Sequence, residues 1–563
     1  MTTTDEGMNR RSVLVAGAAG AGALAFGVSV ADPADAAPNR YFKHGVASGD
    51  PHPRSVILWT RITPIPAATP GSGKGPRARV RWQIAKDRRF RQVVSEGSFG
   101  TGPARDHTVK FEATGLAPRT TYFYRFLYRG VSSRIGRTRT APAYNSDPDR
   151  LRFGVVSCAN LQAGYFAAYR HLAQRDDLDA VLHLGDYLYE YEPGHYGYGN
   201  ANEDIRKHHP AREMVRLADY RQRHAQYKRD QDLQALHAKA AFIVTWDDHE
   251  SANDAYRTGA DNHQPETEGR WAARRRSAYR AYDEWMPVRM GDTVKLGDGT
   301  GLFRRLRFGT LAELSMLDLR TCRSKQAEQA AFPVPSPDGQ VSDPSRTITG
   351  DAQMAWLKGS LAANRAQWKL VGNPVMIAPV VFPPLPSDLT SAVNDVTGLL
   401  PEDGLPYNVD QWDGYTADRR EIFRHLTDNG VNDTVFLTGD IHSAWACDLP
   451  LDAGTYPVTK SVGTEFVCTS VTSNNLDDIT GSPPRTTSLA VEAGIQANNR
   501  HVKYLNFDDH GYSVLDVTSK RTQMDYYVIS DRRDRGATSM WTASWATDAN
   551  TQQVRPVDRP VGR

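Results

Sequence analysis

The sequence has few cysteines, almost no net charge and, beyond its first forty residues, no long apolar run. Four cysteines in 563 residues are far too few for a disulfide-stabilised scaffold. A net charge of +3, with 24% charged residues, gives no overall electrostatic attraction to nucleic acid or to an anionic membrane. No later segment is apolar over the length that spans a bilayer. We therefore expect a globular monomer with a large core, no stable nucleic-acid partner and no transmembrane segment in the mature chain.

The first 37 residues contain the long apolar run that the rest of the chain lacks. Arg10 and Arg11 precede an apolar stretch over 13–31 that is rich in Gly and Ala, and small residues follow up to Ala37. A positive region, an apolar region and a small-residue cleavage site, in that order, are typical of a secretory signal, and the arginine pair resembles a twin-arginine signal. An ordinary secretory signal and a retained anchor are the alternatives, although the weak hydrophobicity argues against an anchor.

We assign residues 1–37 to a twin-arginine signal peptide. We expect the twin-arginine export machinery as a partner and a secreted, extracytoplasmic location. Because that route carries folded proteins, its cargo often takes up a metal or cofactor before export. The signal therefore directs attention to metal-binding side chains.

Two patterns follow the signal. Short segments rich in Val, Ile, Tyr, Phe and Trp, separated by turn residues, predict a small fibronectin-like all-β domain over residues 38–141. From 150 to 535 strands alternate with helices, which predicts a layered α/β domain with helices outside the sheets. We expect 536–563 to form a C-terminal tail, and 382–418, rich in Pro, Asp and Gly, to form a long surface loop.

Four predicted strands of the α/β region end in side chains that bind metals. Ligands in open α/β sheets collect at the carboxyl ends of strands, where loops hold polar groups over the sheet. Each side chain alone has a plainer explanation, as a turn residue, a small core residue or a structural histidine. All four would have to be incidental together, so the set is a strong signal. Its members are Cys158 after FGVVS, Asp186 after LHLG, Asp247, Asp248 and His249 after FIVTW, and Asp440 and His442 after VFLTG.

The residue types predict a hydrolytic centre with more than one metal ion. Asp186 can bridge two ions through its two carboxylate oxygens, while Asp440 and His442 point to the same side of an extended chain. Asn253 adds an oxygen ligand of the kind that hard cations prefer. A Cys thiolate, the Tyr189 phenolate and a His nitrogen together suit trivalent iron far better than magnesium.

Five motifs resemble the PhoD-type alkaline phosphatase and phospholipase D family: SCAN, LGDYLYE, WDDHESAND, AYDEWMP and GDIHSAW. In addition, GVASGDPHPRSVILWTR at 45–61 resembles the N-terminal domain of that family. The resemblance covers nearly the whole mature chain. It implies a four-layer αββα metallophosphatase sandwich that holds one Fe³⁺ and one or two Ca²⁺.

Carried over to this sequence, the resemblance implies roles for individual residues. The iron ligands would be Cys158, Asp186, Tyr189 and His442. The calcium ligands would be Asp186 as the bridge, Asn253, Asp440 and, either as a ligand or behind the ligands, Asp248. Arg274 or Arg275, upstream of AYDEWMP, would clamp the phosphate, because a planar guanidinium binds two phosphoryl oxygens at once.

These assignments predict a secreted, metal-dependent hydrolase of phosphate esters that uses a metal-activated water. His249 would protonate the leaving oxygen or steady the transition state, or else serve as a buried structural histidine bonded to Asp247 or to a backbone carbonyl. Monoesters are the expected substrates, with diesters as a further class, and a phospholipase D acting on phosphatidylcholine-type lipids is the alternative. A binding protein that has lost catalysis would lack a cluster residue, and a zinc amidohydrolase would use several His ligands, so both rank lower.

Three cysteines remain once Cys158 is assigned to the metal, an odd number in an exported protein. Cys447 and Cys468 lie in segments that we expect to be neighbouring strands, where a disulfide could form. The family pattern implies small residues at these two positions, so a pair of cysteines is a departure from it. Two reduced core cysteines are an equally open alternative.

Overall fold

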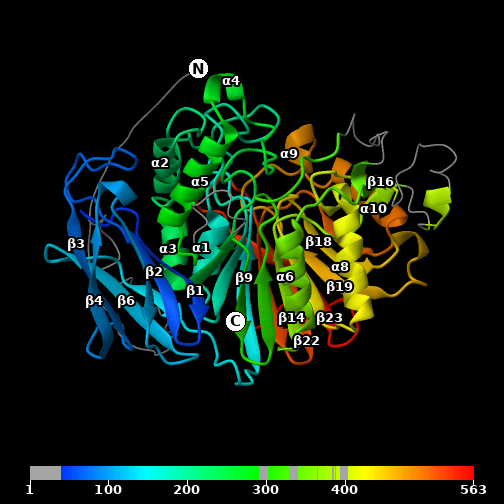
Figure 1. Cartoon of the computed structure of the whole chain (residues 1–563), viewed down its shortest axis with the longest axis horizontal. Coiled ribbons are helices and arrows are strands. Elements are labelled where there is room, and N and C mark those ends of the chain that lie inside the picture. The colour runs from blue at the N-terminus through cyan, green and yellow to red at the C-terminus, as the bar shows by residue number, and fades with distance from the viewer. Residues whose placement is uncertain are drawn as a thin grey trace, which may run out of the picture. The chain divides into compact units, whose positions relative to one another are not determined.

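The computed structural model describes residues 40–290, 302–328, 340–363, 365–382, 386, 388–392 and 404–562. The signal expected at residues 1–37 lies outside these ranges. The described chain is mixed α/β, with two large sheets at its centre (Figure 1). Among its helices, none is both long and apolar enough to cross a membrane.

The first large sheet has ten strands in the order β24-β23-β22-β21-β9-β10-β11-β1-β2-β5. At its centre β9, β10 and β11 run parallel, so their carboxyl ends meet at one edge. The strand bounds are β1 Val46–His52, β2 Ser55–Arg61, β5 Thr108–Thr114, β9 Arg150–Val156, β10 Ala180–Leu184, β11 Ala241–Thr245, β21 Gly511–Thr518, β22 Arg521–Ile529, β23 Ser539–Asp548 and β24 Val554–Pro556.

The second large sheet has seven strands in the order β12-β13-β14-β17-β19-β18-β20. Here β13, β14, β17 and β19 are parallel neighbours, and they too bring their carboxyl ends to one edge. The strand bounds are β12 Arg304–Phe308, β13 Ala312–Met316, β14 Trp368–Asn373, β17 Thr434–Thr438, β18 Ala444–Pro450, β19 Ser461–Val467 and β20 Val502–Asn506. A two-stranded antiparallel sheet pairs β15 (Val381–Phe382) with β16 (Leu405–Pro406).

Apolar side chains on both faces of the central strands pack the two sheets together and cover them with helices. On β10, Leu182 belongs to the cluster shared with Leu370 of β14, whereas Val181 belongs to the cluster on the other face. Side chains alternate along a strand, so a strand buried on both faces reads as a continuous apolar run. The two strands that carry the central acids, AVLHL and TVFLT, are accordingly buried throughout.

The helices divide between the two sheets. Figure 1 shows α2, α3 and α5 beside one another next to the N-terminal strands, with α6 and α8 grouped on the opposite side. Side chains of the first group pack in the cluster with Val181, and side chains of α6, α8 and α10 pack in the cluster with Phe436 of β17. The helix bounds are α1 Ala167–Ala173, α2 Leu217–Tyr227, α3 Gln231–Lys239, α4 Pro265–Glu268, α5 Trp271–Trp285, α6 Asp351–Ala362, α8 Thr416–Asp428, α9 Leu476–Thr480 and α10 Thr487–Asn498.

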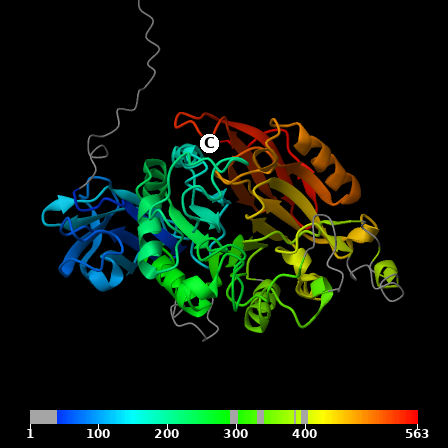
Figure 2. The same cartoon turned by 90° about the horizontal axis from the view of Figure 1, so that it is seen from above.

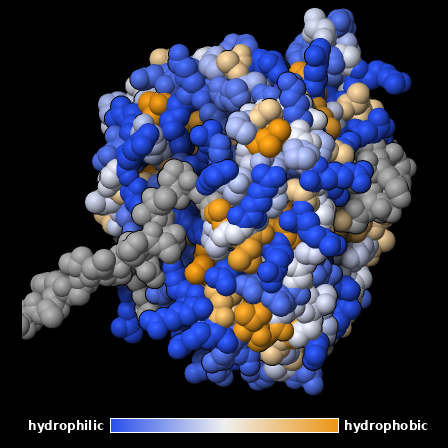
Figure 3. Space-filling model, turned by 90° about the vertical axis from the view of Figure 1, so that its left-hand side faces the viewer, coloured by the Kyte–Doolittle hydropathy of each residue, from blue (hydrophilic) through white to orange (hydrophobic). Residues whose placement is uncertain are grey.

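The N-terminal strands form a β-sandwich, as expected, but they are not separate from the rest. A five-stranded sheet of β3 (Ala78–Ala85), β4 (Val93–Thr101), β6 (Thr121–Tyr128), β7 (Val131–Ser132) and β8 (Gly136–Arg139) packs on β1, β2 and β5 through a common core. Those last three strands extend the ten-stranded sheet, because β1 pairs with β11. The N-terminal module lies at one end of the molecule in Figure 2, and the side viewed in Figure 3 is largely hydrophilic with scattered apolar patches.

The C-terminal segment differs from the expectation of a tail. Within 536–563, β23 pairs with β22 over nine residue pairs and β24 pairs with β23, so the segment completes one edge of the ten-stranded sheet. The strand was missed because most of its residues are only partly buried, which weakens the apolar alternation.

Candidate metal centre

Two Gly-Asp pairs end the central strands of the two sheets and bring them together. Gly185 has φ +108°, and a Cβ there would lie 2.6 Å from the Cβ of Asp247. A Cβ on Gly439 would lie 2.7 Å from the Cβ of Ser157. Only glycine allows the strand ends to approach so closely. The acids that follow, Asp186 and Asp440, adopt the left-handed backbone region with φ of 54° and 67°.

Four of the predicted ligands converge at this edge. Ligand atoms of Cys158, Asp186 and His442 all lie within 4.8 Å of one another. The Tyr189 hydroxyl donates to Asp186 Oδ2 at 2.8 Å and lies 3.4 Å from His442 Nε2. The other ring nitrogen of His442, Nδ1, lies 2.9 Å from the carbonyl oxygen of Asn474, a contact that orients the imidazole with Nε2 toward the group.

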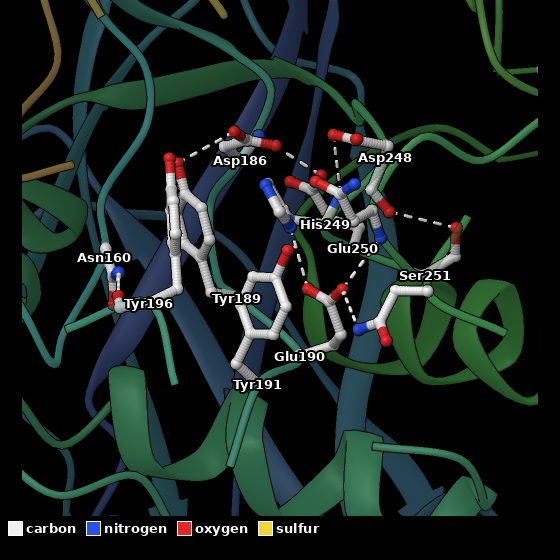
Figure 4. A network of polar contacts seen from close by, with 12 residues as sticks. Asn160, Asp186, Tyr189, Glu190, Tyr191, Tyr196, Asp248, His249, Glu250 and Ser251 are labelled. Atoms are coloured by element: carbon white, nitrogen blue, oxygen red, sulfur yellow. Dashed lines mark hydrogen bonds and ion pairs between the residues drawn. The ribbon is translucent and has the colours of Figure 1, made fainter. Parts of the chain in front are cut away.

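Asp186 also belongs to a second group. Ligand atoms of Asp186, Asp248 and His249 lie within 4.8 Å of one another. Nδ1 of His249 lies 2.8 Å from Glu190 Oε2, so the partner of this histidine is Glu190 rather than Asp247 or a backbone carbonyl. Figure 4 shows Asp186 between the Tyr189 hydroxyl on one side and the Asp248–His249 group on the other.

The electrostatics of the groups fit bound cations. Oδ1 of Asp186 is buried and has no hydrogen-bond partner within the described residues. Burial, reinforced by neighbouring carboxylates, raises the pKa of Asp186 and of Asp440 well above the usual range. Burial and the same two acids also raise the pKa of the Cys158 thiol. Crowded, buried and incompletely bonded anionic groups are what a cation stabilises, so these residues fit the metals implied by the sequence.

The pKa values of His249 and His442 are shifted in opposite directions. Burial alone would lower the pKa of His249, but Asp248, Asp186 and Glu190 outweigh it and raise that pKa well above 6.5. Burial raises and His249 lowers the pKa of Glu190, and the net effect brings it to about 2. Burial lowers the pKa of His442 to about 4, which leaves a neutral imidazole, the form that binds metals.

Arg320 connects the acids of the two sheets and was missed from the sequence. Its guanidinium donates to Asp247 at 2.6 and 3.0 Å and to Asp410 at 3.0 and 2.8 Å. It also lies 3.8 Å from Asp248 and 3.9 Å from Asp440. Arg320 follows β13 closely, so the strand-end pattern was a usable signal for it. Asp410 gave no such signal, because it lies in the Pro-rich stretch expected to be a surface loop. Asp388 and Leu389 of that stretch are exposed, whereas Asp410 is largely covered and pairs with Arg320.

Asn253 and its neighbour Asp254 lie in the turn after His249. The Asn253 N–H donates to Glu190 Oε1 at 2.7 Å, and the Asp254 N–H donates to Asp248 Oδ2 at 2.6 Å. The turn thus holds Glu190 and Asp248 in place through backbone donors. The final glutamate of LGDYLYE was overlooked as an orienting group, although its position in the motif was visible.

The two arginines expected to clamp phosphate have other partners. Arg274 is buried on α5, where all three of its side-chain nitrogens are bonded, to Tyr220, to Asn262, and to the carboxylates of Glu268 and Glu213. Arg275 donates to the carbonyl oxygens of Arg257 and Thr321. The guanidinium of Arg274 is fully bonded within the protein, which argues against a phosphate clamp there. Arg275 donates through Nη1, and its buried Nε has no hydrogen-bond partner within the described residues, so a clamp at Arg275 stays a prediction.

The disulfide considered between Cys447 and Cys468 is absent, because both are free and buried. Cys447 lies opposite Glu465 in the β18–β19 ladder, and Cys468 is three residues further along. An odd offset places the two side chains on opposite faces of the sheet, where they belong to different apolar clusters. They are reduced core residues.

Comparisons with known proteins agree along nearly the whole chain. The PhoD-like phosphatase family model matches residues 153–526, and the model of the PhoD-like phosphatase N-terminal domain matches residues 28–142. The chain is 35% identical over 555 residues to alkaline phosphatase D of Bacillus subtilis strain 168, covering 97% of this chain and 89% of that protein. It also matches a solved structure described as "Structure of PhoD" at 34% identity with a TM-score of 0.81, covering 93% of each chain. The chain belongs to the PhoD-like phosphatase family.

Proposed function

We propose that this protein is a metal-dependent alkaline phosphatase that hydrolyses phosphate esters. The observation that carries the proposal is the position of Asp186, whose carboxylate belongs both to the group with Cys158 and His442 and to the group with Asp248 and His249. A shared carboxylate between two sets of donors is the arrangement expected of a site with two or more ions, which catalyse displacement at phosphorus. Family membership supports the same reaction.

The donor types support iron on one side of Asp186 and calcium on the other. Cys158, Tyr189 and His442 offer sulfur, phenol oxygen and imidazole nitrogen, a set that suits Fe³⁺. The remaining donors are oxygens, which suit one or two Ca²⁺: Asp186 itself, Asp248, Asn253 and Asp440. When bound, these ions supply Lewis acidity and an activated water.

The chain's own residues supply proton transfer and order. His249 has a raised pKa and so keeps a proton available to the leaving alcohol oxygen. Glu190 fixes the orientation of that imidazole through the 2.8 Å contact at Nδ1. Arg320 neutralises part of the negative charge of Asp247 and Asp410, which keeps the acid-rich loops in place.

Monoesters are the proposed substrates, with diesters as a further class. The phospholipase D alternative is not favoured, because the relative and the solved structure that cover nearly the whole chain carry phosphatase and PhoD names. We further propose that the core is a four-layer αββα sandwich, which is supported by one apolar cluster between the sheets and one on the helix-covered face of each. Twin-arginine export of a secreted monomer is part of the same proposal and rests on the sequence signal.

Metal analysis with visible spectroscopy tests the assignment. Protein from the exported fraction should contain iron and calcium and show a charge-transfer band, because phenolate and thiolate ligands to Fe³⁺ absorb visible light. Y189F and C158S should each shift or weaken the band. A colourless, fully active enzyme that contains only zinc would overturn the iron assignment, and initial rates on p-nitrophenyl phosphate and its bis-ester would rank the two substrate classes.

A further inference from the structure

A second phenol lies over the candidate metal centre. The ring of Tyr196 stacks on Tyr189 at a centroid distance of 5.7 Å and on His249 at 5.9 Å, and lies 6.5 Å from the ring of His442. Figure 4 shows the rings of Tyr189 and Tyr196 side by side, with both hydroxyls toward Asp186. The Tyr189 hydroxyl donates to Asp186, whereas the Tyr196 hydroxyl has no hydrogen-bond partner in the part of the chain that the structure describes.

The loop that carries Tyr196 is fastened to both sides of the iron-type donor group. Next to Cys158, the Asn160 side chain donates to the Tyr196 carbonyl and the Gln162 side chain donates to the His195 carbonyl, each at 2.6 Å. On the other side, Asn474 accepts from His442 through its carbonyl oxygen. Its side chain meanwhile donates to the Gly197 carbonyl and accepts from the Gly199 N–H. The same segments that hold Cys158 and His442 therefore hold Tyr196.

The backbone of Tyr196 adopts a strained conformation that its local sequence does not require. Its φ is +55°, in the left-handed region that a bulky non-glycine side chain seldom occupies. Such strain persists where surrounding bonds determine the conformation, and it concentrates at sites that bind ligands. Four side-chain hydrogen bonds from Asn160, Gln162 and Asn474 provide that determination here.

Tyr196 also borders an open hollow. A cavity of about 330 Å³ is lined by Tyr191, Gly194, His195, Tyr196 and Asn202. The rings of Tyr191 and Tyr196 pack against each other at a centroid distance of 5.3 Å, so together they line the hollow with one continuous aromatic surface. Its volume is at the small end of ligand pockets, which suits one ring but not a lipid.

We propose that Tyr196 is a catalytic residue whose hydroxyl donates a hydrogen bond to a phosphoryl oxygen of the bound ester, and that its ring and Tyr191 form a subsite for a ring-bearing alcohol portion. This inference rests on the proposed phosphatase function and specifies its substrate class. The Tyr196 hydroxyl is directed toward Asp186, which belongs to both donor groups, so it faces the place where a phosphoryl group bound at the centre would lie (Figure 4). A hydroxyl that donates to a charged phosphoryl oxygen forms one of the stronger kinds of hydrogen bond.

The hydroxyl is tested with Y196F and a matched control, Y198F, in the metal-loaded enzyme. Tyr198 is in the same loop, but its ring lies against Arg532 and Arg533. We expect Y196F to lower kcat/KM for p-nitrophenyl phosphate by about tenfold to a hundredfold, the usual loss for a hydrogen bond to a charged group. Iron content, calcium content and the visible band should stay at wild-type values, and Y198F should retain wild-type activity. Full activity in Y196F, or a loss of activity matched by a loss of metal, would overturn the catalytic role.

The subsite is tested by binding rather than turnover. Isothermal titration calorimetry should show that the wild-type enzyme binds phenylphosphonate about tenfold more tightly than methylphosphonate, because the phenyl group stacks on the tyrosine rings. Y196A and, as a second variant that leaves the loop anchor intact, Y191L should reduce this ratio toward one. An unchanged ratio in both variants would overturn the subsite. If the metal-loaded wild type hydrolysed no phosphate ester, the proposed function itself would fail, a result distinct from either of these.

Discussion

Two buried clusters of ionisable side chains, one acidic and one basic, differ in how the repulsion between like charges is relieved. They meet just after β10: Asp186 belongs to the acidic cluster, and the next residue, Tyr187, bonds to His237 in a basic one. In the basic cluster, the Nζ of Lys228 lies 2.8 Å from His237 Nε2 and 5.0 Å over the rings of Trp59 and Tyr187. Among the described residues no carboxylate pairs with this lysine.

The difference lies in how each cluster avoids unpaired charge. The acidic cluster keeps a crowd of carboxylates next to Arg320 and the proposed cations. The basic cluster removes charge by deprotonation: burial lowers the pKa of Lys228 and of His237 well below their usual values, and that of His183 to about 3. A cluster that binds cations keeps its acids as anions, whereas a cluster with only structural contacts becomes neutral.

Breaking the acidic cluster at its shared residue should have the largest effect. We expect D186N to lower kcat on p-nitrophenyl phosphate by about a thousandfold or more, because one substitution removes a donor from both groups. Metal analysis should show that iron and calcium are both depleted. Loss of only one metal would mean that Asp186 does not bridge the two groups.

Removing Arg320, the cationic side chain within the acidic cluster, should have the second largest effect, a loss of stability. We expect R320M to lower the free energy of unfolding by about 3–5 kcal/mol, because Asp247 and Asp410 are left buried without their partner. Urea denaturation measures this loss. The matched control is R304M, which breaks a comparable buried pair with Asp50, and it should be destabilised without a change in metal content. Equal metal loss in both variants would mean that Arg320 has no particular role at the site.

The basic cluster should tolerate the replacement of its ionisable lysine by an apolar side chain. Lys228→Met replaces the buried amine with an apolar side chain of similar length, so we expect the free energy of unfolding at pH 7 to rise on the order of 1 kcal/mol. Activity should stay within about twofold, because Lys228 contacts no group of the metal centre. A strong destabilisation of K228M would show that the lysine has a partner in the folded protein that outweighs its burial.

The smallest expected effect is on the pH dependence of the free energy of unfolding, to which the basic cluster contributes. Burial lowers the folded-state pKa of Lys228, so between that lowered value and the unfolded value the unfolded chain binds more protons at this lysine than the folded protein does. Its contribution to stability therefore rises with pH, from the lowered folded pKa up to the unfolded value near 10.5. In K228M this part of the slope should vanish in the pH range just below the unfolded value of Lys228, as measured by denaturation at a series of pH values. Parallel slopes in the two proteins would mean that Lys228 is charged in the folded state.

Local patterns predicted the strand-end ligands, and partners distant in sequence were not predictable in the same way. Asp186 and Asp440 follow apolar runs that identify their strands, so the parallel arrangement alone brings them near one edge. Arg320 and Asp410 are 90 residues apart, and nothing in either segment specifies the other. The family resemblance implied a phosphate clamp at Arg274 or Arg275, but the carboxylates that bond Arg274 come from separate segments whose folding the sequence does not reveal.

Loops account for the remaining differences. Tyr196 lies in a stretch without apolar periodicity, so its place over the centre depends on Asn160 and Asn474, which no local rule connects to it. The two cysteines on neighbouring strands were equally ambiguous until the ladder register became known. The alternation of the β18–β19 pair then decides the matter, since a shift of one residue would have reversed it.

The pairing of β1 with β11 has a consequence for how the chain stays soluble. β11 is a wholly buried strand of AFIVT, and β1 pairs with its outer side in parallel, with Gly49 opposite Phe242. A version of the enzyme trimmed of residues 38–141 would expose that apolar strand as an unpaired sheet edge, which other chains can pair with. The N-terminal module thus protects this strand from pairing with other chains. A catalytic fragment prepared without the module should aggregate and precipitate before its activity can be measured.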